Sequence, residues 1–407
     1  MARLVMKFGG TSVGDPERIR NVADHVARHR RRGDEVVLVV SAMGKETDDL
    51  IRTAKEVSNT RPGREMDMLI TAGERKAIAL VCMALADLGI EGASFTGSQA
   101  GFITDTKHED AKILEVRADR IEAALQAGKV PVVAGAQGVS TDNDVTFLGR
   151  GGSDTTAVAL AKALNADAAE LYTDVSGVFT TDPRLVEKAR KMNTISFDEL
   201  LEMTANGCPK PAMRSVEYAV RHGVKLHVRS AFTWESGTWV VEEDPNMEHA
   251  TVRAIVHELN EAKVTVTGVP DRPGVAARLF RALAEAGVNV DMIVQNASEE
   301  GNTDISFTVP HDDLDVAVST AEGLKDELGI RAVIGDPSVA RVSVIGAGMK
   351  NNPGIAATMF ETLANAGINI DMISTSTIRI SAAVAESDAE RAVAVLHDVY
   401  ELDQSEY

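Results

Sequence analysis

The sequence contains few cysteines and few aromatic residues. Two cysteines, Cys82 and Cys208, occur in 407 residues, which excludes a disulfide framework and any C-x-x-C zinc spacing. Aromatic residues make up 4% of the chain, so we expect a core built mainly from Ala, Val, Leu and Ile. The chain also lacks a Walker A loop and a G-x-G-x-x-G fingerprint, the usual signatures of P-loop and dinucleotide-binding proteins.

Long apolar runs and an excess of basic residues are also missing. No stretch of about 18 apolar residues appears, which argues against a membrane span. The N-terminus, MARLVMKFGG, lacks the apolar segment of a signal peptide. The net charge of −19 argues against binding to nucleic acid or to an anionic membrane, both of which need a basic face. We therefore expect a cytoplasmic protein.

The first 240 residues alternate short β-rich runs with helical patterns. Continuous apolar strands separated by helices predict a parallel sheet covered on both faces. Residues 234–250 are rich in acidic and turn residues, so we place a domain boundary there. The pattern predicts a helix over 16–33 and strands over 3–8, 35–43, 130–139 and 169–179.

The C-terminal third contains an internal repeat. Residues 273–293 match residues 353–373 at an offset of 80, with 13 of 21 positions identical. Each copy follows a short strand, at 263–269 or 341–347, and precedes another. The pattern predicts two βαββαβ domains. Such a pair is typical of ligand sensing, and a duplicated oligomerisation module is the alternative interpretation.

Two glycine-rich turns before helices are the strongest chemical signal in the first domain. In VMKFGGTS (5–12), Lys7 ends a strand and the glycines let backbone N–H groups approach an anion. In GRGGSD (149–154), Ser153 or Asp154 is a candidate N-cap, but a cap alone requires neither Arg150 nor two glycines. Two such turns suit a ligand with several negative groups, and phosphoryl transfer fits best.

These residue types have individual chemical uses. Lys7 can stabilise charge on a transferred phosphoryl group, Arg150 can hold a carboxylate with two hydrogen bonds, and Asp154 can orient Lys7 or the acceptor. Glu74 begins an apolar helix, either as an acid favoured by the helix dipole or as a partner for a substrate ammonium. The aspartates of YTDVSGVFTTDPR (172–184) either frame a nucleotide or form Asx turns.

Five motifs and one doubled module occur along the chain in a specific order: KFGGTS, VVSAMG, LITAGE, GRGGSDTTA, YTDVSGVFTTDPR and the doubled PG…N-[VI]-D-M-I module. Together they resemble the aspartate kinase family over nearly the whole chain. The resemblance implies an amino-acid-kinase α/β/α sandwich with a mostly parallel central sheet over residues 1–245. It implies two ferredoxin-like ACT domains over 262–340 and 341–407, with a strand near 251–257 joining the regulatory region. The implied reaction transfers the γ-phosphoryl group of ATP to the β-carboxylate of L-aspartate, the first step toward lysine, threonine, methionine and isoleucine.

Family roles transfer to matching positions. Lys7 and Asp154 resemble the catalytic pair. The resemblance implies that aspartate is bound by Thr47, Glu74, Arg150 and Ser153. It implies an ATP site formed by Lys7, Phe8, Gly9, Gly10, Ser41, Tyr172, Thr173, Asp174, Phe179, Asp182 and Arg184. Mg²⁺ is expected to bridge the ATP phosphates, without a protein ligand that can be named.

One segment departs from the family pattern. After EMTANG, where the family has a Ser-Lys pair, this chain has Cys208 and Pro209, and Lys210 lies one residue late. Two prolines also fix the local backbone and remove hydrogen-bond donors. Either Lys210 reaches the nucleotide from a shifted loop or this ATP contact is lost, and we assign Lys210 to the ATP site with altered affinity as the expected consequence.

The regulatory half is expected to bind threonine, lysine or both. Strand–helix turns such as DRPG (271–274) offer backbone N–H groups to an amino-acid carboxylate. The matching effector positions are Asp271, Gly274, Ala276, Asn289, Asp291, Gln295, Ser298, Asn369 and Ile370. In the second copy Asn351 replaces the aspartate, so the two sites are expected to differ.

The resemblance also implies partners and leaves two alternatives open. We expect a homo-oligomer joined through the ACT domains, and Met247 lies where a shorter regulatory chain starts in one subgroup, unless it is an ordinary linker residue. A related kinase acting on glutamate, acetylglutamate or a nucleotide is one alternative. A catalytically impaired amino-acid sensor that uses only its ACT pair is the other.

Overall fold

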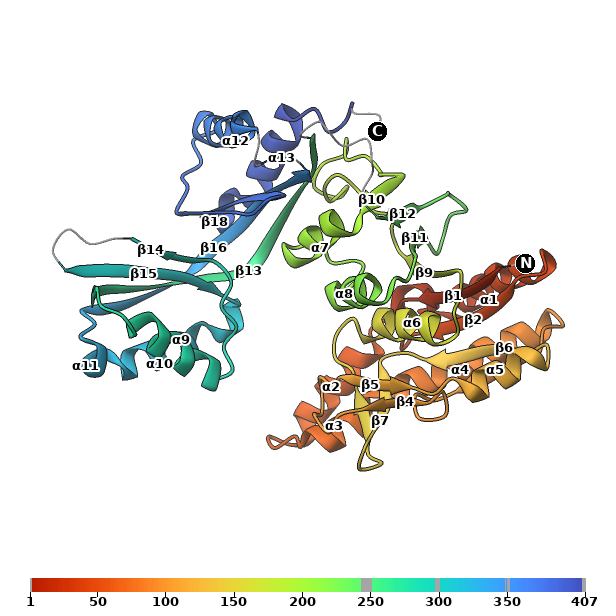
Figure 1. The fold of residues 1–407 in the computed structure, drawn as a ribbon. Helices are drawn as coiled ribbons and strands as arrows, with labels where there is room; N and C mark the ends of the chain where they lie inside the picture. Colours follow the sequence, from red (N-terminus) through yellow and green to blue (C-terminus); the bar gives the residue numbers. More distant parts are fainter. Residues whose placement is uncertain (1, 243–250, 297–300, 348, 350–351, 405–407) are drawn as a thin grey trace. The chain divides into compact units, whose positions relative to one another are not determined.

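The computed structural model describes residues 2–242, 251–296, 301–347, 349 and 352–404 of the 407 (Figure 1). Two compact units are present. The first contains Met1–Val178, Lys191–Thr204 and Pro209–Pro245, and the second contains Phe179–Arg190, Ala205–Cys208 and Asn246–Tyr407. Positions 247 and 298, which carry the predicted start site and one predicted effector contact, lie outside the described residues.

Two short segments depart from the predicted domain division. Residues 179–190 and 205–208 were assigned by sequence to the first domain, but they pack in the second unit. Backbone and side-chain hydrogen bonds explain this. The N–H of Ile255 donates to the carbonyl of Thr180, and the Oδ1 atom of Asn206 accepts from the guanidinium of Arg379 at 2.7 Å.

The first unit is built on a mostly parallel sheet of eight strands (Figure 1). β1 pairs in parallel with β2 and β9, and β12 is antiparallel to β11. In sheet order the strands are β10 (Thr194–Ser196), β12 (Thr238–Val241), β11 (Leu226–Ser230), β9 (Ala168–Thr173), β1 (Arg3–Phe8), β2 (Glu35–Val40), β6 (Val130–Ala134) and β3 (Gly92–Phe95).

Helices cover both faces of this sheet, as its apolar strands predict. α1 (Pro16–Arg31) begins where Asp15 accepts the N–H of Arg18 and Pro16 occupies the first turn. Leu4, Met6 and Phe8 pack against α1 and α4 (Ala72–Asp87). Since side chains alternate along a strand, Lys7 faces the opposite side, where α6 (Gly152–Ala163) packs against β1 and β9.

The remaining helices and a small sheet complete the first unit. The helices are η1 (Gly10–Val13), α2 (Glu46–Val57), α3 (Gly63–Ile70), α5 (Asp119–Gln126), α7 (Phe197–Ala205, whose last residue belongs to the second unit) and α8 (Met213–His222). The small sheet contains, in order, β5 (Ile113–Val116), β4 (Phe102–Thr104), β7 (Gln137–Ser140) and β8 (Val145–Phe147).

The single strand predicted over 130–139 is wrong. The segment forms β6 and β7, which belong to different sheets. The chain turns at Gly135 and Ala136, and Ala136 adopts a φ of +58°. A side chain at position 135 would lie 2.4 Å from the Oγ atom of Ser153, so only glycine fits at this turn.

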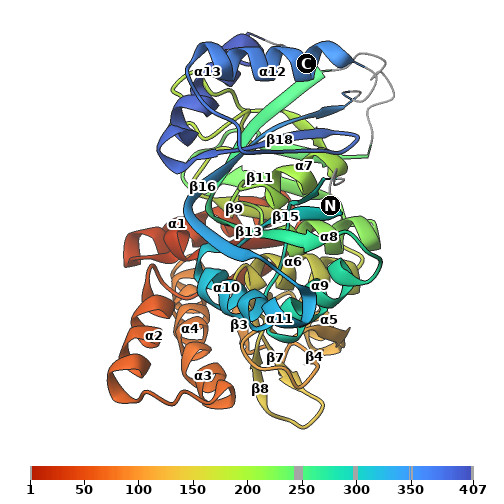
Figure 2. The same cartoon turned by 90° about the vertical axis from the view of Figure 1, so that its left-hand side faces the viewer.

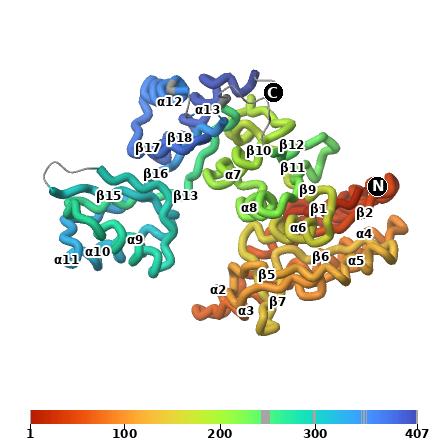
Figure 3. Tube along the Cα trace, in the orientation of Figure 1, coloured from red at the N-terminus to blue at the C-terminus, as the bar shows by residue number. Residues whose placement is uncertain are grey.

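The second unit is one six-stranded sheet shared by both repeats (Figures 1 and 2). In sheet order its strands are β14 (Ile293–Gln295), β15 (Asn302–Val309), β13 (Thr251–Pro270), β16 (Ala332–Ala347), β18 (Arg379–Ala385) and β17 (Met372–Thr375). Its helical segments are α9 (Val275–Glu285), η2 (His311–Asp313), α10 (Leu314–Gly323), α11 (Lys325–Leu328), α12 (Pro353–Asn365), η4 (Glu386–Asp388) and α13 (Ala389–Val399). Figure 3 shows α9, α10 and α11 together at the β15 end of this sheet and α12 and α13 at the β18 end.

The two repeats exchange strands. The C-terminal half of β13 belongs to the first repeat, whereas its N-terminal half, Thr251–Glu258, pairs with the part of β16 that opens the second. The strand expected near 251–257 therefore joins the regulatory region, and it completes the second repeat. In the described residues no strand follows α13.

Reciprocal ion pairs accompany this exchange. Lys263 and Arg341 occupy matching positions at the starts of the two repeats. Lys263 pairs with Asp371, the aspartate of the N-x-D-M-I motif in the second repeat. Arg341 pairs with Asp291, the equivalent aspartate of the first repeat. Arg341 also contacts Glu261 at 2.9 Å, and both of these side chains are buried. These charges pair the two repeats across the shared sheet, whose strands are joined by the β13–β16 backbone ladder.

None of the helices in the described part of the chain combines the length and apolar character that crossing a membrane requires.

Candidate active site

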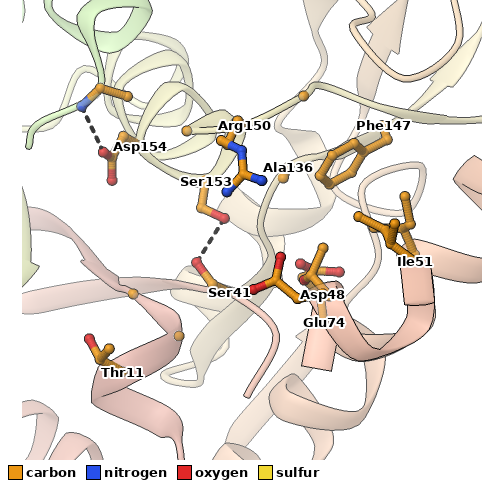
Figure 4. Close-up of a pocket in the computed structure, with 18 of the residues that line it drawn as sticks. Thr11, Ser41, Asp48, Ile51, Glu74, Ala136, Phe147, Arg150, Ser153 and Asp154 are labelled. Carbon is orange, nitrogen blue, oxygen red and sulfur yellow. Dashed lines mark hydrogen bonds between the residues drawn. The ribbon is translucent and has the colours of Figure 1, made fainter. Parts of the chain in front are cut away.

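A cavity of about 840 Å³ opens in the first unit at the C-terminal ends of β1, β2 and β9 (Figure 4). This edge is where open α/β sheets bind ligands. Both predicted glycine-rich turns contribute to the cavity. The predicted site residues that line it are Lys7, Gly9, Gly10, Ser41, Thr47, Glu74, Arg150, Ser153, Asp154, Tyr172, Thr173 and Lys210.

Lys7 and Asp154 meet in the lining of the cavity. The Nζ atom of Lys7 lies 2.6 Å from the Oδ1 atom of Asp154, and the two side chains are 11% and 9% exposed. The other carboxylate oxygen of Asp154 accepts the backbone N–H of Ala212 at 3.0 Å, marked by a dashed line in Figure 4. Both oxygens of Asp154 are therefore engaged, which fixes the ammonium of Lys7 beside the glycine turns.

The glycines are required where the backbone approaches its neighbours closely. A Cβ atom on Gly10 would lie 2.8 Å from the carbonyl oxygen of Ala42. Gly151 has a φ of +73°, and a Cβ atom there would lie 2.4 Å from the Cβ of Ala212. Any larger residue at either position would push the turn away from the cavity.

The N-cap prediction at the second turn is wrong. The sequence favours Ser153 or Asp154 as the cap of a helix starting near Thr155, but α6 begins at Gly152 and Gly151 is its N-cap. Ser153 and Asp154 instead lie in the first helical turn, buried and directed at the cavity. Their side chains are thus available for contacts other than capping.

Arg150, Ser153 and Glu74 point into the same part of the cavity (Figure 4). The hydroxyl of Ser41 donates to the Oγ atom of Ser153 at 2.9 Å, which joins the end of β2 to α6. Arg150 is exposed and lines the cavity. It is the only positively charged side chain among the residues that Figure 4 labels. A cation and a carboxylate that face one space suit a zwitterion.

Glu74 is a buried carboxyl group with one unsatisfied oxygen. Its Oε1 atom accepts the N–H of Ala42 at 3.2 Å, whereas Oε2 has no hydrogen-bond partner. Burial raises the pKa of Glu74 to about 7, and the nearby carboxylate of Glu46 adds to the rise. An ammonium group bound here would satisfy Oε2 and favour the ionised form.

The nucleotide side of the cavity contains the departure noted in the sequence. The Nζ atom of Lys210 lies 2.7 Å from the Oδ1 atom of Asp174, and Lys210 lines the cavity together with Pro209. The ring of Tyr172 stacks on Phe8 with centroids 4.4 Å apart. Phe8 itself is fully buried in the core with α1 and α4 and is not part of the cavity lining.

Asp174 is not part of the cavity lining, and three other predicted nucleotide residues lie in the second unit. Phe179, Asp182 and Arg184 belong to the second unit, where the guanidinium of Arg184 pairs with Asp182 at 2.6 Å. Their assignment to the ATP site stays a prediction.

Apart from Thr47, the sequence did not identify the part of the cavity wall supplied by α2 and by the loop that follows it. Asp48 and Ile51 point into the cavity in Figure 4, and Lys55 and Arg61 also line it. No residue of α2, all of which the structure describes, is buried. The acidic start of this amphipathic helix, at Glu46, Asp48 and Asp49, is an ordinary helix signal and does not distinguish a ligand site from a solvated face.

The predicted effector positions in the second unit are mostly exposed. Asp271 and Gly274 lie in the turn before α9, and Gly274 has a φ of +97°. Asn289 and Asp291 border a cavity of about 250 Å³ beside Arg341. The other described positions of this set are Ala276, Gln295, Asn369 and Ile370.

The carboxylates around the cavity bear on how a metal ion could be held there. Within the described residues no group of three or more His, Cys, Asp or Glu side chains is arranged to hold a metal ion. Asp154 and Asp174 are each paired with a lysine. Magnesium commonly binds through substrate phosphates with few protein carboxylates, so the arrangement fits Mg²⁺ arriving with a polyphosphate.

Comparisons with known proteins agree with this geometry. The amino acid kinase family model matches residues 2–230, and an ACT domain model matches 264–322 and 342–400. An aspartokinase of Mycolicibacterium smegmatis is 53% identical over 407 residues, covering 99% of this chain and 97% of that protein. The crystal structure of E. coli aspartokinase III with aspartate and ADP has a TM-score of 0.81 at 25% identity, covering 97% of this chain and 99% of that chain. The structure of the same E. coli enzyme with lysine and aspartate has a TM-score of 0.72 at 25% identity, covering 97% and 98%.

The site and the comparisons lead to one conclusion. The site has two glycine turns around a lysine–aspartate pair, with a carboxyl group and a guanidinium facing one cavity, and the similarity extends over the full chain. The chain belongs to the aspartokinase family: it is a kinase of aspartate with an amino acid kinase domain and two ACT domains.

Proposed function

We propose that the cavity binds L-aspartate and Mg²⁺–ATP on either side of the Lys7–Asp154 pair. The observation that carries this proposal is the 2.6 Å contact between these two buried side chains, between the two glycine turns. A fixed cation beside backbone N–H groups is suited to a phosphoryl group whose charge must be neutralised in the transition state.

The aspartate side is formed by Glu74, Arg150, Ser153 and Thr47. Arg150 binds the α-carboxylate through its planar guanidinium, and Glu74 accepts the α-ammonium on its unsatisfied Oε2 atom. The hydroxyl groups of Thr47 and of Ser153, which accepts a hydrogen bond from Ser41, donate hydrogen bonds to the substrate. Together these residues orient the β-carboxylate toward Lys7. This positioning lowers the entropic cost of reaching the transition state and so raises the rate.

The ATP side is formed by the Lys7–Gly10 turn and the end of β9. Backbone N–H groups at Gly9 and Gly10 hold the phosphates, and Tyr172 and Thr173 line the approach. Lys210, which pairs with Asp174 and lines the cavity, contacts the phosphates in this proposal despite its one-residue shift. Mg²⁺ would be held mainly by the nucleotide itself and would supply positive charge that offsets the charge of the phosphates.

The transfer needs no general base. A β-carboxylate with a pKa of about 4 is already ionised at neutral pH. One of its oxygens forms a bond to the γ-phosphorus, the bond from that phosphorus to the β,γ-bridging oxygen breaks, and ADP leaves with the electron pair. Asp154 therefore serves to hold Lys7 in place and not to remove a proton.

The second unit is proposed to sense threonine, lysine or both and to assemble the enzyme as a homo-oligomer. The turn at Asp271–Gly274 offers N–H groups and a carboxylate to an amino acid. The E. coli aspartokinase III structure that contains lysine supports lysine as an effector. The shorter regulatory chain from Met247 and the role of threonine rest on the sequence resemblance alone.

Trapping of the product with hydroxylamine tests the proposal. The full chain is incubated with Mg²⁺–ATP, hydroxylamine and one acceptor from a panel of aspartate, glutamate, N-acetylglutamate and a nucleoside monophosphate. An acyl hydroxamate formed from aspartate alone is expected, and replacing Mg²⁺ with EDTA should abolish it. Turnover of another acceptor, or of none, would contradict the proposed reaction.

A further inference from the structure

Arg214, which lies in the first turn of α8, bridges two separate backbone segments of the first unit. Its Nη1 atom donates to the carbonyl of Leu148 at 2.6 Å, and its Nη2 atom donates to the carbonyl of Ala111 at 2.7 Å. The side chain is one-quarter exposed, and Nη1 lies 3.6 Å from the carboxylate of Asp110. Arg214 is not among the residues that line the cavity.

Leu148 is the anchor on one side of the Arg150 turn. It is fully buried, and its N–H donates to the carbonyl of Ala136. Beyond it, Gly149 and Gly151 adopt φ values of +84° and +73° on either side of Arg150. Glycines restrict the backbone little, so the position of Arg150 depends on the anchors that flank the turn.

The same short segment also anchors the other end of the turn. Two residues before Arg214, the N–H of Ala212 donates to Asp154, and the Cβ of Ala212 fills the space in front of Gly151. Ala212 and Arg214 thus hold the end and the beginning of the turn that contains Arg150. The sequence shift at Cys208–Pro211 immediately precedes this pair of anchors.

We propose that Arg214 is a positioning residue for the amino-acid substrate. It fixes the backbone that presents Arg150, and so sets the affinity for aspartate rather than for ATP. This inference rests on the proposed role of Arg150 in binding the α-carboxylate. The planar fork of arginine matches two carbonyl acceptors at once, whereas a lysine ammonium lacks this rigid geometry.

Steady-state kinetics of the full chain test the inference. Arg214→Met is expected to raise the KM for aspartate by roughly 10- to 100-fold, with the KM for ATP within about twofold of wild type. Arg214→Lys should recover part of the loss. Arg117→Met, at an exposed arginine paired with Glu115, is the matched control and should leave both constants unchanged. A purely structural role for Arg214 would move both KM values or neither.

A double-variant cycle with Arg150→Ala identifies the route of the effect. Because Arg214 acts through Arg150, adding Arg214→Met to Arg150→Ala should raise the aspartate KM by less than twofold further. Multiplicative effects, or an unchanged aspartate KM in folded Arg214→Met, would overturn the inference. If Arg214→Met lacks a cooperative melting transition, Arg214→Lys decides: a selective rise supports the inference and no rise overturns it. An unchanged aspartate KM in Arg150→Ala would instead overturn the proposed function on which the inference rests.

Discussion

The ammonium of Lys7 lies 2.6 Å from the carboxylate of Asp154, and both are almost completely buried. Lys7 is the next-to-last residue of the central parallel strand β1, and Asp154 lies in the first turn of α6, which packs on the face of β1 that carries Lys7. Isolated burial of either charge would be costly, so each requires the other. The backbone N–H of Ala212 holds the second carboxylate oxygen, which gives the pair one fixed geometry before any substrate binds.

Glu74 should make aspartate binding depend on pH. Its pKa is raised to about 7 mainly by burial, and only the ionised form accepts an ammonium strongly. The KM for aspartate should fall as the pH rises through 7 and then level off, so that at pH 6 it is about tenfold above its plateau. Initial rates between pH 5.5 and 8.5 measure this. Glu74→Gln should raise the KM by about 10- to 100-fold and flatten the profile, which separates this group from others that titrate.

The same carboxyl should lower stability at high pH. Its folded-state pKa lies above the unfolded value of 4.5, so the folded chain binds the proton more tightly. Its contribution to stability is therefore present in full below about 4.5 and is lost as the pH rises to 7, by roughly 3 kcal/mol. Without substrate, Glu74→Gln should be more stable than wild type at pH 8 in urea unfolding. Glu91→Gln, at an exposed residue, is the control, and equal stability of all three proteins at pH 8 would contradict the assignment.

Lys210 should contribute to ATP binding from its shifted position. Its pairing with Asp174 is half-exposed, so its contribution is modest. Lys210→Ala should raise the KM for ATP about 3- to 10-fold and leave the KM for aspartate unchanged, a loss of about 1 kcal/mol. Lys162→Ala, on the far end of α6, is the control. An unchanged KM for ATP would show that the departure from the family pattern removed this contact.

The buried charges that join the two repeats should differ in importance. Arg341 and Glu261 are 3% and 7% exposed, whereas Lys263 and Asp371 are 20% and 32% exposed. Glu261→Ala should destabilise the second unit by about 3–5 kcal/mol because it removes a buried partner of Arg341. Asp371→Ala should cost about 1 kcal/mol or less. Denaturant titration of the full chain measures both, and equal losses would contradict this ranking.

Local sequence patterns were sufficient for most of the fold. The alternation of apolar strands and helices predicted the parallel sheet, and the matching of 273–293 with 353–373 predicted the paired regulatory folds. The break at Gly135–Ala136 was missed because a continuous apolar run conceals a turn set by contact with Ser153. The strand exchange between β13 and β16 was also missed, since pairing between distant segments leaves no periodic signal in either one.

Some residues of the site were also predictable from the sequence, whereas others were not. Motifs identified Lys7, Glu74, Arg150 and Asp154, because their chemistry is tied to glycine turns and helix starts that are visible in sequence. The contributions of Ala212 and Arg214 were not visible. A backbone N–H has no side-chain signature, and an arginine that donates to two carbonyls resembles any surface arginine until the fold brings Leu148 and Ala111 beside it.

The central claim is that Lys7 and Asp154 act as one unit on the transferred phosphoryl group. Single-turnover transfer from ATP to aspartate, measured with Lys7→Met, Asp154→Asn and the double variant, tests it most directly. Each single variant should slow transfer by at least about 100-fold, and the double variant should be no slower than the slower single one. Rates within threefold of wild type for either single variant, or losses that multiply in the double variant, would contradict the account.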